Sequence, residues 1–232
     1  MKTTIKTFSI YGIAYLILLA IVLDLLYALP KEDLHLLMNS HHIPSEDIFF
    51  KYYSTMAEWP LYVLALLPVF WKQIQMTIFF ALSELTGGAV LQILKHLFCF
   101  DRPASVFEHH GHVLLPLVQG VDMHHGNSFP SGHASTFFVF FTCCCCALIL
   151  AYHYRQSPSR QSLRKLYLVR MSMPVLFTMA ALGAYSRVYL SQHFMSDVCV
   201  GSIIGFVTPC LYFFFARNRI YKLSNKLYRA KP

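Results

Sequence analysis

Two histidines have the clearest chemical potential in this chain of 232 residues. His193 is followed four residues later by Asp197, a spacing that puts a carboxylate beside an imidazole on one face of a helix. A carboxylate that holds one ring nitrogen leaves the other nitrogen free to attack an electrophile. His133 follows Ser131 and Gly132 at the expected start of a helix, where free N–H groups can bind phosphate. This pattern favours phosphoryl transfer, with one histidine attacking phosphorus and the other protonating the leaving oxygen.

Three cations could neutralise the charge of a transferred phosphoryl group. Lys95 and Arg102 are seven residues apart, which can place both on one helix face, and Pro103 is expected to end that helix. Arg187 lies at the end of a later apolar segment. Cations and helix N–H groups together stabilise charge that is spread over the equatorial oxygens. This inventory supports phosphoryl transfer without a metal ion.

The elements that must position these residues are membrane-spanning helices. Hydrophobic residues make up 56% of the chain and charged residues only 13%, which is too apolar a composition for a soluble domain. We predict an all-α integral membrane protein with a single domain over residues 1–232 and six transmembrane helices in a bundle. The predicted spans are residues 7–29, 58–71, 75–98, 131–152, 166–185 and 192–216.

A short amphipathic helix is expected between the first and second spans. Ser45 is a suitable N-cap, and Glu46 and Asp47 follow it in the first turn, where negative charge is favourable. Apolar residues then recur at helical spacing, including Ile48 and Tyr52. We predict that this helix lies on the outer face of the membrane.

The distribution of charge predicts the topology. The net charge is +8, which could indicate nucleic acid or anionic lipid. With both termini in the cytoplasm, 14 of the 19 lysine and arginine residues fall in cytoplasmic segments, as is typical of membrane proteins. We therefore interpret the basic tail as a topology signal that could also contact anionic headgroups, and we expect no nucleic-acid partner. The histidine site then lies on the outer side.

Several groups inside the spans are interpreted as structural. The consecutive cysteines from Cys143 to Cys146 fit neither a disulfide framework nor a zinc site, and we expect them to pack as small hydrophobic residues. Asp24 and Glu84 are acids within predicted spans, a position that often marks function. For both we expect a buried hydrogen bond.

A long outer loop contains further histidines that could bind a metal. Few acidic residues and no cysteine in the loop complete a ligand set, so we favour solvated histidines or contacts with a substrate headgroup. A non-enzymatic, histidine-rich metal-binding or transport protein stays open as an alternative. These histidines are His109, His110, His112, His124 and His125.

At these residues the sequence resembles the type 2 phosphatidic acid phosphatase superfamily, which carries the motifs KxxxxxxRP, PSGH and SRxxxxxHxxxD. Every defining position is present in order, from Lys95 to Pro103, from Pro130 to His133 and from Ser186 to Asp197. The six-span layout is also similar, so the resemblance covers nearly the whole chain. The superfamily includes soluble vanadate-binding haloperoxidases, but the hydropathy of this chain argues against that branch.

The resemblance implies that His193 forms a phosphohistidine intermediate and is held by Asp197. His133 would be the general acid that protonates the leaving group and would then help to activate water. Ser186 belongs to the third motif but receives no role. No metal or cofactor is expected. The residues implied to bind the phosphate are Lys95, Arg102, Ser131, Gly132 and Arg187.

The resemblance also implies a membrane lipid phosphate as substrate. Undecaprenyl diphosphate, phosphatidylglycerol phosphate, phosphatidic acid and a lipid A phosphate group are all substrates of the superfamily, and the motifs distinguish none of them. A lipid phosphotransferase that uses the same site stays open. The chain has no Asn-x-Ser/Thr sequon, which is compatible with a bacterial inner-membrane protein whose site faces the periplasm. The sequence predicts no oligomeric state.

Overall fold

The computed structural model describes residues 2–58, 62–64, 74–110, 115–154 and 160–229, and within these ranges all regular secondary structure is helical. Among the described residues, five helices are long and apolar enough to cross a membrane. They are α1 (Lys2–Ala28), α5 (Ile74–Leu97), α7 (Gly132–Tyr154), α8 (Arg160–Tyr189) and α9 (Met195–Arg229). The chain is therefore an all-α integral membrane protein, as predicted. The predicted second span, residues 58–71, lies mostly outside the described residues, so the six-span count stays a prediction.

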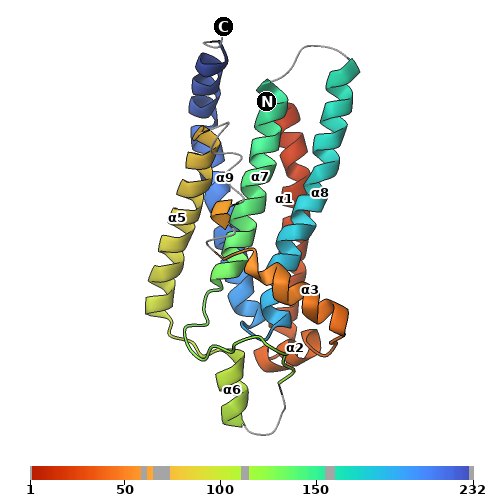
Figure 1. Ribbon diagram of the computed structural model, residues 1–232, viewed down its shortest axis with the longest axis vertical. Helices are drawn as coiled ribbons and strands as arrows, with labels where there is room; N and C mark the ends of the chain where they lie inside the picture. The colour runs from red at the N-terminus through yellow and green to blue at the C-terminus, as the bar shows by residue number, and fades with distance from the viewer. Residues whose placement is uncertain (1, 59–61, 65–73, 111–114, 155–159, 230–232) are drawn as a thin grey trace.

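Helix α7 is the centre of the bundle and packs against α1, α5, α8 and α9 (Figure 1). In the apolar part of α7, 67% of the residues are buried, against 11% in α1. The reason is its composition, because a helix that is apolar on every side is stable only when neighbours surround it. The cysteines of α7 belong to this packing: Cys143, Cys145 and Cys146 are buried among hydrophobic residues, as expected.

Helices α7 and α9 approach closely because α9 has glycine at the contact. A Cβ atom on Gly201 would collide with the carbonyl oxygen of Ser131, and one on Gly205 would collide with that of Ser135. Small residues four positions apart allow two membrane helices to bring their backbones together. This contact sets the start of α9 directly beside the start of α7.

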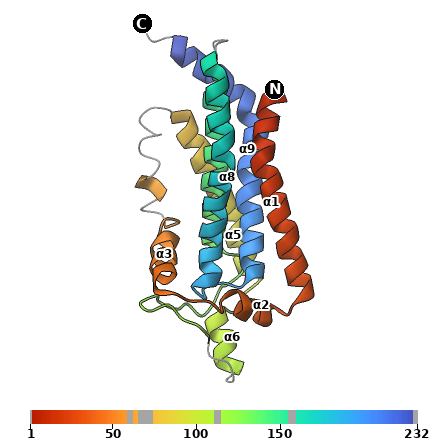
Figure 2. The same ribbon diagram turned by 90° about the vertical axis from the view of Figure 1, so that its right-hand side faces the viewer.

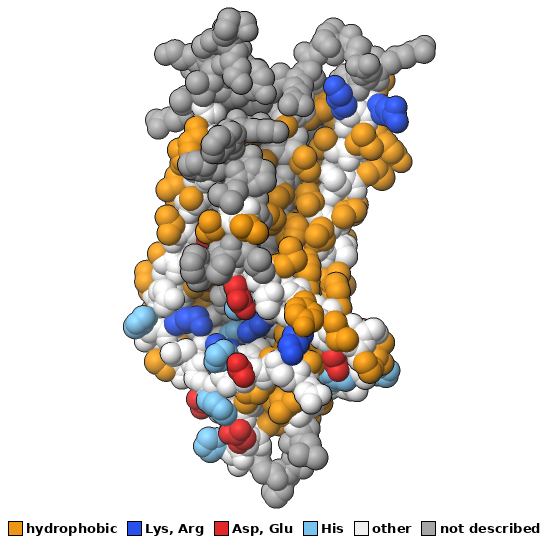
Figure 3. All heavy atoms as spheres, in the orientation of Figure 1, with side chains coloured by type: hydrophobic (Ala, Val, Ile, Leu, Met, Phe, Trp, Pro, Cys, Tyr) orange, Lys and Arg blue, Asp and Glu red, His pale blue; other side chains and the backbone are white. Residues whose placement is uncertain are grey.

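Three shorter helices lie at one end of the bundle (Figure 2). Polar and charged side chains gather at this end, and hydrophobic side chains cover much of the helices beyond it (Figure 3). The start of α1 and the end of α9 lie at the opposite end (Figures 1 and 2), as the predicted topology requires. The short helices are α2 (Lys31–Met38), α3 (Pro44–Thr55) and α6 (Pro103–His110).

Helix α3 is the predicted helix between the first two spans, although it starts at Pro44 rather than at Ser45. Its N-cap residue is Ile43, which makes no side-chain capping bond, and Pro44 occupies the first helical position, where proline is well tolerated. The expected cap at Ser45 is therefore wrong. The placement of α3 on the membrane surface stays a prediction.

Two further expectations need correction. Pro103 does not end the helix that contains Lys95: α5 ends at Leu97, and Pro103 begins α6. Arg102 therefore lies in a turn between two helices rather than two turns along α5. Asp24 is exposed on α1, so the expected buried hydrogen bond is wrong for it. For Glu84 the hydrogen bond is present but only partly buried: its carboxylate accepts a bond of 2.5 Å from Thr136.

Candidate active site

The N-terminus of α7 forms one part of the candidate site. Ser131 is fully buried, and its Oγ accepts the backbone N–H of Ala134 at 3.4 Å, which confirms it as the N-cap. Its own N–H donates to the carbonyl oxygen of Asp197 at 3.0 Å, so the first turns of α7 and α9 are joined directly. No protein atom lies within 4 Å of the position that a Cβ on Gly132 would occupy. The helix start is thus open to an anion.

The start of α9 is organised by Asp197. We expected His193 to start this helix, but α9 begins at Met195 and His193 precedes it. The Oδ2 atom of Asp197 accepts the N–H of Phe194 at 3.0 Å, and its Oδ1 atom accepts the hydroxyl of Ser196 at 3.2 Å. A side chain in the first turn that reaches back to the N-cap backbone stabilises a helix start. Asp197 therefore has a structural role besides any role in chemistry.

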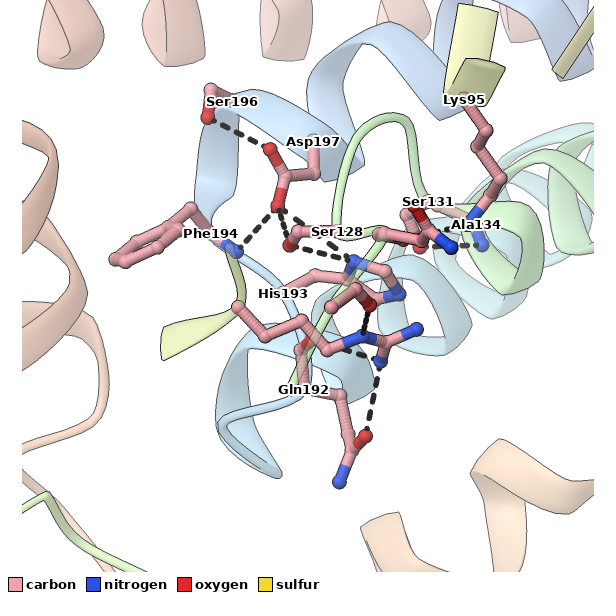
Figure 4. A network of polar contacts seen from close by, with 12 residues as sticks. Lys95, Ser128, Ser131, Ala134, Gln192, His193, Phe194, Ser196 and Asp197 are labelled. Atoms are coloured by element: carbon pink, nitrogen blue, oxygen red, sulfur yellow. Dashed lines mark hydrogen bonds and ion pairs between the residues drawn. The ribbon is translucent and has the colours of Figure 1, made fainter. Parts of the chain in front are cut away.

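His193 and Asp197 lie close together at the start of α9 (Figure 4). The Nδ1 atom of His193 lies 3.7 Å from the Oδ2 atom of Asp197, which is too long for a hydrogen bond. The Ser128 hydroxyl lies beside this pair and contacts both residues, 2.5 Å from Oδ2 of Asp197 and 3.4 Å from Nδ1 of His193. The predicted pair is present, with a serine hydroxyl bound to both members.

Arg187 is a buried cation beside His193. It lies in the last turn of α8, and its backbone oxygen accepts the N–H groups of Gln192 and His193 at 2.9 and 3.1 Å. Its guanidinium NH1 donates to Ser54 of α3 at 2.6 Å. The Nε atom is buried and has no hydrogen-bond partner among the described residues. A buried donor without a partner costs free energy, and an anion at this position would satisfy it.

Arg102 and Lys95 reach the site from the other side. Arg102 donates from Nε to the oxygen of Gly126 at 2.9 Å and from NH1 to the backbone oxygen of Gln192 at 3.2 Å. Lys95, in the last turn of α5, donates to the oxygen of Asn127 at 2.8 Å. Both cations therefore hold the loop before α7, and Arg102 also contacts the turn that carries His193.

The turn between α8 and α9 is held by contacts from α2 and from Asn39, the residue that follows α2. Ser191 has a left-handed backbone conformation with φ of 53°, which is uncommon for a residue with a side chain. Asn39 donates to its hydroxyl at 2.5 Å, and the ring of His35 lies 3.4 Å from the same oxygen. Burial lowers the pKa of His35 to about 4, so this ring is neutral near pH 7. The network holds Gln192 and His193 in place.

A polar cavity of about 320 Å³ lies next to this cluster, although His193, Lys95 and Arg102 do not line it. His133, Arg187 and Gln192 line one side, and the loop before α7 contributes His124. His133 and Arg187 line this same cavity, so the expected general acid lies near one of the expected phosphate-binding cations. Four further polar side chains line the cavity: Lys51, Ser54 and Thr55 of α3, and Glu58 just after α3.

Burial also determines the charge state of His193, whose side chain is almost completely enclosed. Loss of hydration lowers the pKa of His193 below the ordinary value of about 6.5, while Asp197 acts in the opposite direction. The imidazole is therefore neutral near pH 7. Because the neutral ring is the nucleophilic form, the site keeps His193 ready to attack.

The remaining loop histidines do not share one environment. His109 contacts the backbone oxygen of Ser105 at 2.6 Å, and His125 lies 3.7 Å from Glu108. His112 lies outside the described residues. Among the described residues, no three or more histidine, cysteine, aspartate or glutamate side chains are grouped to hold a metal ion.

Three residues of the site were not anticipated from the sequence. Gln192 is buried and links Arg102 to the loop, where its amide donates to the oxygen of Asp122 at 3.0 Å. Ser54 binds Arg187 from α3, and Ser128 binds His193 and Asp197. Only Ser128 carried a detectable signal, because it lies five residues before His133, in the loop that leads into α7.

Comparison with known proteins identifies the fold and the family of this chain. No curated protein matches the chain. The crystal structure of Aquifex aeolicus LpxE has a TM-score of 0.55 and 22% identity, covering 77% of this chain and 92% of that one. The crystal structure of a transmembrane PAP2-type phosphatidylglycerolphosphate phosphatase from Bacillus subtilis has a TM-score of 0.54 and 20% identity, covering 94% and 98%. These likenesses show a shared fold. The model of the PAP2 superfamily matches residues 76–221, a segment that contains all three motifs, and the chain therefore belongs to that superfamily.

Proposed function

We propose that this protein is a membrane phosphatase that hydrolyses a phosphomonoester or diphosphate of a lipid through a phosphohistidine intermediate. The observation that carries the proposal is the surroundings of His193. A buried, neutral imidazole is joined through one turn to Arg187 and Arg102, and it lies beside the open N-terminus of α7. Positive charge around a buried nucleophile is suited to an electron-rich phosphoryl group.

The first step forms a bond between Nε2 of His193 and phosphorus. The bond between phosphorus and the leaving oxygen breaks, and His133, which enters this step protonated, gives that oxygen its proton and becomes neutral. Arg102, Arg187 and Lys95 neutralise charge on the phosphoryl oxygens, with the N–H groups of Ser131 and Gly132 at the α7 start. In the second step water attacks phosphorus, the bond to His193 breaks, and His133 takes the proton of the water. Inorganic phosphate is released and both histidines return to their initial states.

The cavities favour a substrate with an apolar tail. A second, small cavity of about 40 Å³ lies between α7 and the residues that follow α3. It is lined by Ala57, which precedes Glu58 of the polar cavity, and by Thr136, one helical turn beyond His133. Since α7 runs from the site into the membrane, this apolar cavity lies deeper in the bilayer than the phosphate site. A lipid could place its phosphate at His193 and its chain along α7.

The fold relatives and the charge distribution support a more specific proposal. The two similar crystal structures are of LpxE and of a phosphatidylglycerolphosphate phosphatase, and the second of these enzymes is named for a lipid phosphate. We infer that this protein also acts on a lipid phosphate from a bacterial inner membrane. Basic residues concentrate in the segments assigned to the cytoplasm, so the termini would be cytoplasmic and the site would face the periplasm.

The proposal is tested by phosphate release from a panel of lipid phosphates, with purified protein and excess chelator. The panel contains phosphatidic acid, phosphatidylglycerol phosphate, undecaprenyl diphosphate and a lipid A phosphate. We expect release of inorganic phosphate from at least one lipid, unchanged by chelator. Transfer of phosphate to another acceptor would identify a phosphotransferase. Activity that chelator abolishes and zinc restores would contradict the metal-independent mechanism, and no turnover of any lipid would contradict the proposal.

Filling the apolar cavity is expected to impair lipid substrates selectively. Ala57→Leu adds three carbon atoms to a cavity of about 40 Å³, so the variant should show a raised KM for the best lipid substrate. Hydrolysis of a soluble aryl phosphate, which has no chain, should change little. Both rates are measured in the same detergent micelles.

A matched control adds the same atoms elsewhere. The control is Ala181→Leu. Ala181 lines a separate apolar groove of about 410 Å³ between α1 and α8, across α8 from the polar cavity. This variant should leave the KM of the lipid substrate unchanged. An equal loss for lipid and soluble substrates in Ala57→Leu would show that the cavity does not hold the chain.

A further inference from the structure

We propose that Ser128 is a positioning residue that connects His193 to Asp197 and holds the imidazole with Nε2 free to attack. The inference rests on the proposed function, because it assigns a role relative to the nucleophile. It also changes the expected arrangement, in which the carboxylate of Asp197 holds the ring directly.

The geometry decides the direction of the hydrogen bonds. The Ser128 hydroxyl lies 2.5 Å from Oδ2 of Asp197 and 3.4 Å from Nδ1 of His193. A hydroxyl has one proton to donate, and an ionised carboxylate can only accept. The proton of Ser128 therefore goes to Asp197, and its oxygen is left to accept from Nδ1–H of His193. With the proton on Nδ1, the lone pair is on Nε2.

The three residues are enclosed, so water does not replace these bonds. The exposed fractions are 0% for Ser128, 2% for His193 and 3% for Asp197. In such surroundings each polar group depends on its protein partner, and a missing partner is costly. Nδ1 of His193 and Oδ2 of Asp197 are too far apart to form a hydrogen bond, so Ser128 is the partner that the imidazole has here.

The backbone holds Ser128 firmly in this position. Its N–H donates to the oxygen of Phe100 at 2.8 Å, which ties the loop before α7 to the turn after α5. The preceding residue, Asn127, has φ of 52°, and its oxygen accepts the ammonium group of Lys95 at 2.8 Å. The segment that carries Ser128 is therefore fixed from two sides, and the hydroxyl is held toward α9.

The role in the reaction follows from the charge that develops on the ring. As the bond from Nε2 to phosphorus forms and the bond to the leaving oxygen breaks, the imidazole keeps the proton on Nδ1 and becomes positively charged. The hydrogen bond from Nδ1–H to the Ser128 hydroxyl then becomes stronger. The hydrogen bond from Ser128 to the carboxylate of Asp197 strengthens with it. The leaving oxygen takes its proton from His133, so no proton needs to leave His193 in this step.

The test is the rate of phosphoenzyme formation in Ser128→Ala, measured by rapid quenching with a radiolabelled lipid substrate. A hydrogen bond that involves a charged group contributes a factor of roughly 10 to 100, so we expect a loss of that size in this step. The KM should change little, since Ser128 does not touch the substrate. Ser128→Cys keeps the size of the side chain but bonds weakly, and it should lose rate as well.

A matched control removes the hydroxyl on the other side of the carboxylate. Ser196 donates to Oδ1 of Asp197 at 3.2 Å, whereas Ser128 and the imidazole face Oδ2, so Ser196→Ala should cost much less. In an Asp197→Asn background, Ser128→Ala should add little further loss, because the two residues act through one connection. Thermal unfolding of each variant verifies that the fold is retained.

The outcomes separate this inference from the proposed function. Wild-type rates in Ser128→Ala, equal losses in Ser196→Ala, or a full additional loss in the Asp197→Asn background would each overturn the role of Ser128. A wild-type rate of phosphoenzyme formation in Ser128→Cys would show that the side-chain volume matters rather than the hydrogen bond. That result would also overturn the role of Ser128. A wild-type protein that forms no phosphoenzyme would instead refute the proposed function.

Discussion

His193→Ala is expected to abolish lipid phosphate hydrolysis while the helical bundle remains folded. The substitution removes the side chain that forms the covalent bond to phosphorus in the proposed mechanism. Loss of a nucleophile that acts together with its partners lowers turnover by roughly 10⁴-fold or more. Phosphate release is measured in liposomes, and thermal unfolding and helical content are compared with the wild type in detergent.

The same experiment should reveal the covalent intermediate. Wild-type protein mixed briefly with a radiolabelled substrate should retain label that is stable in alkali and released in acid, as expected for a bond between nitrogen and phosphorus. His193→Ala should retain none. His125→Ala is a suitable control, because His125 is at the same end of the bundle but more than half exposed and lies near Glu108. Full turnover by His193→Ala would refute the assignment of the nucleophile.

Gly201→Ala is expected to lower both stability and activity. Its Cβ would collide with the carbonyl oxygen of Ser131, which is backbone and cannot rotate away. Overpacking of this kind costs about 1–3 kcal/mol, and relief of the collision would separate α9 from α7. The start of α7 and the start of α9 would then no longer be held by the bond from Ser131 to Asp197. The melting temperature in detergent and kcat should both fall.

Gly88→Ala provides the matched comparison. It is the same substitution in a membrane helix, but no atom lies within 4 Å of the added Cβ. Alanine is favoured over glycine inside a helix by roughly 1 kcal/mol, so this variant should be as stable as the wild type or more so. If the two variants behave alike, close packing at Gly201 does not position the site.

The sequence alone was sufficient to predict the fold class and the residues that meet. Apolar runs of about 20 residues specify membrane helices because of the thickness of the bilayer, and the start of α7 could be placed from the capping of Ser131. Lys95, Arg102, Ser131, Arg187 and His193 were expected at one end of the bundle. The structure places them there, because each lies at or just beyond the same end of a long helix.

Helix boundaries near the site were less predictable. The seven residues between Lys95 and Arg102 suggested one continuous helix, but α5 ends at Leu97. Proline can stop a helix or begin one, and Pro103 begins α6. The spacing of His193 and Asp197 likewise suggested a shared helix face. Asp197 instead caps α9 by binding the N–H of Phe194, so the helix begins after His193.

What only the tertiary structure decided is the set of contacts between segments that are distant in the chain. Composition and spacing within one sequence report neighbours along a helix, and they specified the two histidines, the cations and the membrane around them. The Ser128 hydroxyl reaches His193 across 65 positions, and Ser54 reaches Arg187 across 133. Such contacts depend on how closely α7 and α9 pack and on where the loops cross, and no local pattern encodes those distances.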